Sequence, residues 1–245
     1  MPRSHMVQTD PTPDQPVLKD DSPFRFVCRD TLPCFTQCCR DVNIYLTPYD
    51  ILRLRRALRI GSTEFLEKHT RHFLARTVNI PVVQLRMDED TLRCMFVSDA
   101  GCTVYENRPW ACRMFPLDLG SREGEYQLIA GKDRCLGLLE SSSSSVGEWL
   151  EGQGVAPYVE MERLFQTVVP SSFKRGAPMD AGLGKIMFLA YDLDRFVEII
   201  RDERFKTFYA VDEDTLRRAL SDDEELLRLA FRYIRSQLEE LYPVT

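Results

Sequence analysis

The sequence lacks the features that membrane-spanning, secreted and nucleic-acid-binding proteins need. No apolar run in its 245 residues approaches the ~18 residues that a membrane helix requires. Its first residues show no basic segment followed by an apolar one, the pattern of a secretory signal. Its 38 Asp and Glu residues outnumber its 32 Lys and Arg residues, which argues against a general nucleic-acid or anionic-membrane binder. We therefore expect a cytoplasmic protein with neither a nucleic-acid nor a membrane partner.

Histidine is scarce, which limits the catalytic and metal chemistry available to it. The three histidines are His5, His69 and His72, so a Ser–His–Asp arrangement has little support. His69 and His72 stand three residues apart in an expected helix and could share a face. Their charged neighbours Lys68 and Arg71 favour a solvated surface over a metal site.

The first 23 residues predict a flexible leader. Residues 1–6 read MPRSHM, which resembles the remainder of an expression tag, so we expect the native chain to start at Met6. Four prolines and several acids follow up to residue 23, with almost no apolar content.

The remaining chain divides by composition into two regions and predicts an α+β fold. Residues 24–140 contain every cysteine, and we expect them to form a metal-binding domain of short strands and helices. Residues 141–145 are serines, a flexible joint that also offers a helix cap for the segment holding Trp149. Residues 141–245 read as mainly helical and are expected to pack on the first domain.

Local patterns place several elements within these regions. Thr47 and Pro48 predict a helix start, Gly61 its end, and a second helix runs from residue 62 or 63 to about 75. Further helices are expected over 192–201 and, behind a capping box at 221–224, up to Pro243. Short strands are expected at 82–87 and 92–97, joined by an acidic turn, and at 102–105 and 125–130.

Cysteine is the feature that this sequence has in abundance. Four of the eight fall within twelve residues as C-x5-C-x3-C-C, three follow as C-x7-C-x9-C, and one stands apart. They are Cys28, Cys34, Cys38, Cys39, Cys94, Cys102, Cys112 and Cys135. Because thiols stay reduced in the cytosol, this number points to metal before disulfides. Clustered soft thiolates suit zinc or an iron–sulfur cluster, so all eight are candidate metal ligands.

The adjacent pair Cys38 and Cys39 favours more than one metal atom. A mononuclear zinc site usually takes two C-x2-4-C pairs, and the sequence has no such pair of pairs. In extended chain, neighbouring side chains point to opposite faces. The pair could therefore serve two metal atoms, or one sulfur could ligate while the other packs. A polynuclear cluster or two sites would accommodate either arrangement.

The neighbouring residues fit thiolate chemistry as well. Several loop amides and five arginines lie close to the cysteines in sequence and could offset their negative charge. The arginines are Arg29, Arg40, Arg93, Arg108 and Arg113. Pro109 and Pro116 restrict the backbone around Cys112, which suits either a rigid ligand loop or a turn with Trp110 and Phe115 in the core.

Separated motifs in the same order resemble the YkgJ-type cysteine-cluster family, a zinc- or iron-chelating domain often described as containing an iron–sulfur cluster. The motifs are Cys28, Cys34 and Cys38-Cys39, then Leu46-Thr47-Pro48-Tyr49-Asp50-Ile51, Cys94, Gly101-Cys102, Tyr105, Arg108-Pro109, Cys112-Arg113 and Phe115-Pro116. The resemblance covers roughly 24–140, and the later segment 191–196 is similar to longer members. The family pattern begins C-x2-C-x3-C-C, whereas five residues separate Cys28 and Cys34 here.

The resemblance implies a cytosolic bacterial metalloprotein, without naming a reaction. We expect an iron–sulfur cluster first, of the 4Fe–4S type, with a redox or catalytic role and a protein or redox partner, and zinc second. One alternative is a structural zinc module that supports protein interaction. Another is a methyltransferase-like enzyme related to flagellin lysine-N-methylases. Gly182-x-Gly184-Lys185 lacks the rest of a phosphate-binding loop and favours a turn before a helix.

Overall fold

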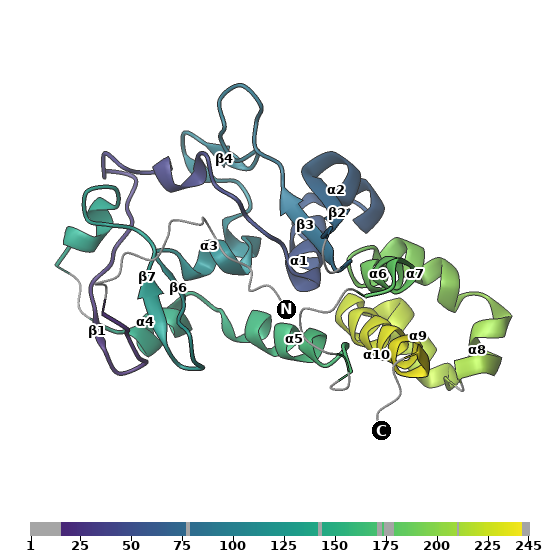
Figure 1. Ribbon diagram of the computed structural model, residues 1–245. Helices are drawn as coiled ribbons and strands as arrows, with labels where there is room; N and C mark the ends of the chain where they lie inside the picture. The colour runs from purple at the N-terminus through teal and green to yellow at the C-terminus, as the bar shows by residue number, and fades with distance from the viewer. Residues whose placement is uncertain are drawn as a thin grey trace. The chain divides into compact units, whose positions relative to one another are not determined.

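The computed structural model describes residues 16–76, 79–141, 144–170, 173, 179–209 and 211–241 (Figure 1). Most of the expected leader, residues 1–15, and the expected helix end at Pro243 lie outside them. Short strands and helices are mixed up to residue 145, and the described elements after it are all helical, which confirms the α+β prediction. Within the described ranges no helix is both long and apolar enough to cross a membrane.

The backbone groups into two compact units that each combine separate stretches of chain. The helical unit takes in the described residues of 46–84 and 158–241, and the cysteine unit those of 16–45 and 85–157. The sequence predicts two domains that divide at residue 140, and that division stays a prediction. By spatial proximity, residues 46–84 group with the C-terminal stretch.

The helical unit consists of helices and one strand pair. Its elements are α1 (Pro48–Leu58), α2 (Ser62–His69), β2 (Thr70–Leu74), β3 (Pro81–Leu85), α5 (Ala156–Gln166), α6 (Ala181–Met187), η4 (Phe188–Ala190), α7 (Leu193–Ile200), α8 (Glu203–Tyr209), α9 (Glu213–Ser221) and α10 (Asp223–Leu241). Its core includes an apolar stripe along α10, where Leu227, Ala230, Ile234 and Leu238 are fully buried. Burial of this stripe, and not helix propensity, gives α10 most of its stability.

Several helix starts confirm the sequence prediction. Thr47 Oγ1 accepts the Asp50 amide at 3.1 Å, the Asp50 carboxylate accepts the Thr47 amide at 2.7 Å, and Pro48 takes the first position of α1. Asp192 likewise caps α7. The predicted capping box at 221–224 is wrong: α9 extends through Ser221, and Asp222 caps α10 by accepting two amides.

The expected second helix is too long, because the chain turns into β2 after His69. Residues 70–74 pair with β3 as a two-stranded sheet, and this pairing overrides the helical pattern. His69 and His72 therefore do not share a helix face. The His72 ring instead packs against Phe188, with 4.9 Å between ring centroids.

The cysteine unit has only short regular elements. They are β1 (Pro23–Phe24), η1 (Gln37–Cys39), β4 (Val97–Ser98), β5 (Gly101–Cys102), η2 (Tyr105–Asn107), α3 (Trp110–Met114), β6 (Leu117–Leu119), β7 (Tyr126–Leu128), η3 (Leu136–Leu139), β8 (Ser144–Ser145) and α4 (Val146–Gly152). The strands form the pairs β1–β8, β4–β5 and β6–β7. Of the strand pairing expected between 82–87 and 92–97, the structure retains one isolated bridge, between Met87 and Cys94. Ser145 caps α4 as predicted.

A glycine in α6 tests the packing of the helical unit. Gly184 lies inside α6, not in a turn before it, and a Cβ there would overlap the Asn79 carbonyl oxygen and press on the Leu74 side chain. We expect Gly184→Ala to lower the free energy of unfolding by about 1–3 kcal/mol through overpacking. Gly152→Ala in α4 has open space around its Cβ and should raise it by about 0.4–1 kcal/mol. Urea unfolding measures both; equal effects would contradict this packing.

Glu162 in α5 predicts a pH-dependent stability. Burial, and with it the charge of Asp50, raises the pKa of Glu162 to about 7, although Gln166 donates a hydrogen bond to it. A folded-state pKa above the ordinary value of 4.5 means that the folded state binds the extra proton between the two values. Binding of this proton stabilises the folded protein by about 3 kcal/mol. This stabilisation is complete at low pH and is lost as the pH rises through 7.

Glu162→Gln should remove this contribution. Between pH 5 and pH 8, the unfolding free energy of the unmodified protein should fall more steeply than that of the variant, in urea titrations at both pH values. The exposed Glu151→Gln is the matched control and should follow the unmodified protein. Parallel curves for both variants would show that Glu162 does not hold this proton.

Candidate metal centre

All eight cysteines lie in the cysteine unit, and each is a free thiol. Cys135 is buried, Cys28 and Cys38 are exposed, and the other five are half-buried. The unit thus concentrates every thiol of the chain between residues 28 and 135. Whether each one ligates stays a prediction.

Backbone pairing brings three of these cysteines together. The Cys94 amide donates to the Cys39 carbonyl oxygen at 2.7 Å, and the Val97 amide donates to the Cys94 carbonyl oxygen at 3.0 Å. Cys102 lies opposite Val97 in the β4–β5 pair. We call Cys39, Cys94 and Cys102 the hairpin group.

The thiols of the hairpin group interact electrostatically. Burial, together with the sulfurs of Cys39 and Cys102, raises the pKa of Cys94 to about 11. Burial and Cys39 also raise the pKa of Cys102. Like charges raise thiol pKa values only at short range, and Cys39 raises the pKa of both other thiols.

A second set forms where the residues around 28–34 meet those around 135–137. The Val27 amide donates to the Gly137 carbonyl oxygen at 3.1 Å, and the amide after Cys135 donates to Cys34 Sγ at 3.3 Å. Burial and then the sulfurs of Cys135 and Cys34 raise the pKa of Cys28. We call Cys28, Cys34 and Cys135 the loop group.

The pair Cys38 and Cys39 joins the two groups. It lies in a 3-10 turn, η1, so the extended backbone that the sequence analysis assumed is wrong. In a 3-10 turn, successive side chains diverge by about a third of a turn. The Cys38 thiol donates a hydrogen bond to the Cys39 sulfur, which raises the pKa of Cys38 and lowers that of Cys39. Cys28 raises the pKa of Cys38 further.

Backbone amides solvate several sulfurs, as the sequence analysis expected. In three cases an amide two residues after the cysteine donates to its sulfur and lowers the pKa of that thiol. These cysteines are Cys94, Cys102 and Cys135. With the amide that donates to Cys34 Sγ, four sulfurs accept main-chain hydrogen bonds. Such bonds favour the thiolate form that a metal requires.

Two of the five candidate arginines act on thiols. Arg93 lowers the pKa of Cys39 beyond the effect of the Cys38 thiol. Arg108 lowers the pKa of Cys102, more weakly than the backbone amide does. The guanidinium of Arg29 instead forms a 3.0 Å ion pair with a carboxylate.

Gln153, which no sequence pattern singled out, fixes two buried arginines. Its side-chain oxygen accepts a hydrogen bond from Arg108 at 2.8 Å, and its carbonyl oxygen accepts one from Arg113 at 2.6 Å. The Arg108 guanidinium also lies 3.8 Å from the centre of the Tyr105 ring. Gln153 immediately follows α4, so only the predicted Ser145 cap indicated that this region is ordered.

Cys112 lies on α3, apart from both backbone-paired groups. Trp110 of the same helix is buried and Phe115 is half-buried, so the proline-flanked segment supplies core side chains as well. The sulfur of Cys112 raises the pKa of Cys38, after the effects of Cys39 and Cys28. The same sulfur raises the pKa of Arg108, which opposes the larger decrease caused by burial.

The donor chemistry of this unit fits a thiophilic metal. Eight free thiols, four sulfur-directed amides and two nearby arginines match the needs of thiolate ligands. Among the described residues, no three Cys, His, Asp or Glu side chains stand ready around one metal position. Binding would therefore have to draw the sulfurs together, as is common when metal binding and folding are coupled.

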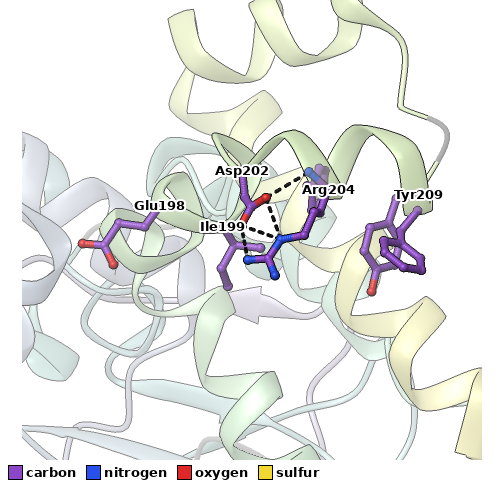
Figure 2. A pocket seen from close by; sticks show the side chains of 7 residues that line it. Glu198, Ile199, Asp202, Arg204 and Tyr209 are labelled. Atoms are coloured by element: carbon purple, nitrogen blue, oxygen red, sulfur yellow. Dashed lines mark hydrogen bonds and ion pairs between the residues drawn. The ribbon is translucent and has the colours of Figure 1, made fainter.

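The helical unit offers a surface hollow of another kind. It is lined by Glu198, Ile199, Asp202, Arg204, Phe205, Phe208 and Tyr209. Figure 2 shows the Asp202 carboxylate turned toward Arg204, with which it forms an ion pair. The hollow contains no thiol, so it is not part of the metal chemistry.

One comparison with known proteins bears on the cysteine unit. Residues 27–135 match a family named CxxCxxCC, described as a putative zinc- or iron-chelating domain. The matched segment begins one residue before Cys28 and ends at Cys135, so it contains all eight cysteines. No curated protein and no solved structure matches the chain.

The YkgJ-type resemblance refers to this same family. Residues 27–135 of this chain are therefore similar to the CxxCxxCC family, which is described as a putative zinc- or iron-chelating domain.

Proposed function

We propose that this protein is a cytoplasmic metalloprotein that binds an iron–sulfur cluster or zinc through the cysteine thiolates of residues 28–135. The observation that carries the proposal is the coincidence of three facts. Every cysteine lies in the family segment, each is a free thiol, and their charges are coupled through Cys39. Free thiols in this number also support a reducing compartment.

An iron–sulfur cluster is the first candidate. The amide-to-sulfur bonds at Cys94, Cys102 and Cys135 are the interactions that set the potential of such a cluster. When bound, the cluster would supply one-electron transfer, which would require a redox partner. The cysteines would hold it, and Arg93 and Arg108 would offset its negative charge.

Zinc is the second candidate, as the core of a structural module for protein interaction. Short strands of two or three residues provide much of the regular structure in the cysteine unit. Such short pairs are weakly stable alone. Metal bonds between segments distant in sequence would then supply folding energy, as in other thiolate-bound zinc modules.

Elemental analysis and a visible spectrum of protein purified without oxygen test the proposal. A cluster predicts about four irons with matching sulfide and a brown colour that dithionite bleaches. A zinc module predicts a colourless protein that unfolds when chelated. Single Cys→Ser changes at 34, 39, 94 and 102 should each lower the metal content. Neither metal in the unmodified protein, even after reconstitution, would refute the proposal.

Gly137→Ala tests the centre without removing a ligand. A Cβ on Gly137 would lie 2.6 Å from the Val27 carbonyl oxygen and 2.9 Å from the Phe26 ring, and would push apart the segments that hold Cys28 and Cys135. We expect metal affinity to fall about 10- to 100-fold, as for lost supporting contacts at other metal sites. Competition with a chelating dye measures this change.

Gly152→Ala is the control, since its Cβ meets nothing within 4 Å. Its metal affinity should equal that of the unmodified protein. An unchanged affinity for Gly137→Ala would mean that the junction of residues 27 and 137 does not position the ligands.

A further inference from the structure

Two hydrogen bonds join the turn that carries Cys38 and Cys39 to the segment that carries Cys94. The Cys94 amide donates to the Cys39 carbonyl oxygen at 2.7 Å, and the Asp41 amide donates to the Leu92 carbonyl oxygen at 2.8 Å. Asp41 and Leu92 both have positive φ angles, of 52° and 58°, which residues other than glycine rarely adopt. Such conformations persist only where the surrounding structure holds them, so this end of the turn has a fixed register.

An aromatic ring at the other end of the turn contacts the β4–β5 pair next to Cys102. Phe35 follows Cys34, and its ring faces Gly101, the residue before Cys102. A Cβ on Gly101 would lie 3.1 Å from Phe35 Cζ and 3.7 Å from Phe35 Cε1. Gly101 also has a φ angle of 109°, which favours glycine. Glycine at this position therefore serves both the backbone conformation and the close approach of the ring.

The β4–β5 pair holds the backbone of Gly101 in place. Ser98 lies opposite Gly101 in the pair, and the Ser98 hydroxyl donates to the Gly101 carbonyl oxygen at 3.0 Å. The Thr103 amide donates to the Phe96 carbonyl oxygen at 2.8 Å. Because Gly101 is buried and has no side chain to rotate away, the Phe35 ring rests on a surface that cannot yield.

These two attachments act at different points of one short segment. The hydrogen bond at Cys39 fixes the end of the turn against Cys94, and Phe35 spaces the beginning of the turn from Cys102. One attachment alone would let the turn pivot, whereas two attachments fix its separation from the segments on both sides. Side chains that are locked by packing hold metal ligands in a productive geometry.

We propose that Phe35 is a positioning residue for the metal centre: its ring, resting on Gly101, sets the separation between the turn that carries Cys38 and Cys39 and the strand that carries Cys102. This inference rests on the proposed thiolate metal binding and adds a contact that spaces the segments supplying the thiols. A spacer acts through the reach of its ring, whereas a residue that only fills space acts through its apolar volume.

Anaerobic titration of Phe35→Leu with Co²⁺ tests this role, because leucine is apolar but lacks the Cζ atom that faces Gly101. Thiolate-to-cobalt absorption reports sulfur ligation, and the ligand-field bands report the geometry around the ion. We expect shifted bands and a Co²⁺ affinity about 10- to 100-fold lower, measured by competition with a chelating dye. Phe208→Leu is the matched control, since Phe208 is 81% exposed in the helical unit, and it should match the unmodified protein.

A double-variant cycle tests the contact itself. Gly101→Ala should lower the Co²⁺ affinity, because its methyl group presses on the ring and its φ angle is strained. In the double variant with Phe35→Leu and Gly101→Ala, the shorter side chain leaves room for the methyl group. The combined loss of affinity should then be smaller than the product of the two single losses. Single losses that simply multiply would contradict the contact.

The outcomes separate the positioning role from the metal binding on which it rests. Unmodified bands and affinity in Phe35→Leu would overturn the positioning role. Loss of the folded circular dichroism signal in metal-free Phe35→Leu would overturn it too, because Phe35 would then support the fold as a whole. Absence of thiolate-to-cobalt absorption in the unmodified protein would instead refute the proposed function itself.

Discussion

Burial of thiols close to other sulfurs is the constraint on which the chemistry of the cysteine unit depends. Without a cation, burial and mutual repulsion keep thiols such as Cys28, Cys94 and Cys102 protonated, because each pKa lies above its ordinary value. Cys39 is the exception, since the Cys38 thiol and Arg93 stabilise its negative charge.

The supporting residues show how a unit with little regular structure can still position ligands. Main-chain amides that follow Cys94, Cys102 and Cys135 point to the sulfurs. Gln153 holds two buried guanidiniums through its side-chain and main-chain oxygens. These contacts use the backbone, which every residue type provides, so the unit needs few special side chains besides its cysteines.

The helical unit is stabilised in a different way. Apolar faces such as that of α10 are buried almost completely, and helix starts are capped by Thr47, Asp192 and Asp222. Its close packing is evident at Gly184, where even one methyl group would overlap a main-chain oxygen. Stability of this unit comes from burial, whereas stability of the cysteine unit would gain most from a metal.

The sequence by itself determined what depends on neighbours within a few residues. The caps at Thr47, Ser145 and Asp192, the apolar stripe of α10 and the thiol chemistry of residues 28–135 all follow from local patterns. Only the tertiary structure decided that residues 70–74 form a strand, that Cys38 and Cys39 occupy a 3-10 turn, and that Cys135 meets Cys28 and Cys34. The reason is physical: each outcome rests on hydrogen bonds that the residue types alone do not specify, and at Cys34 and Cys135 these join segments about 100 residues apart in sequence.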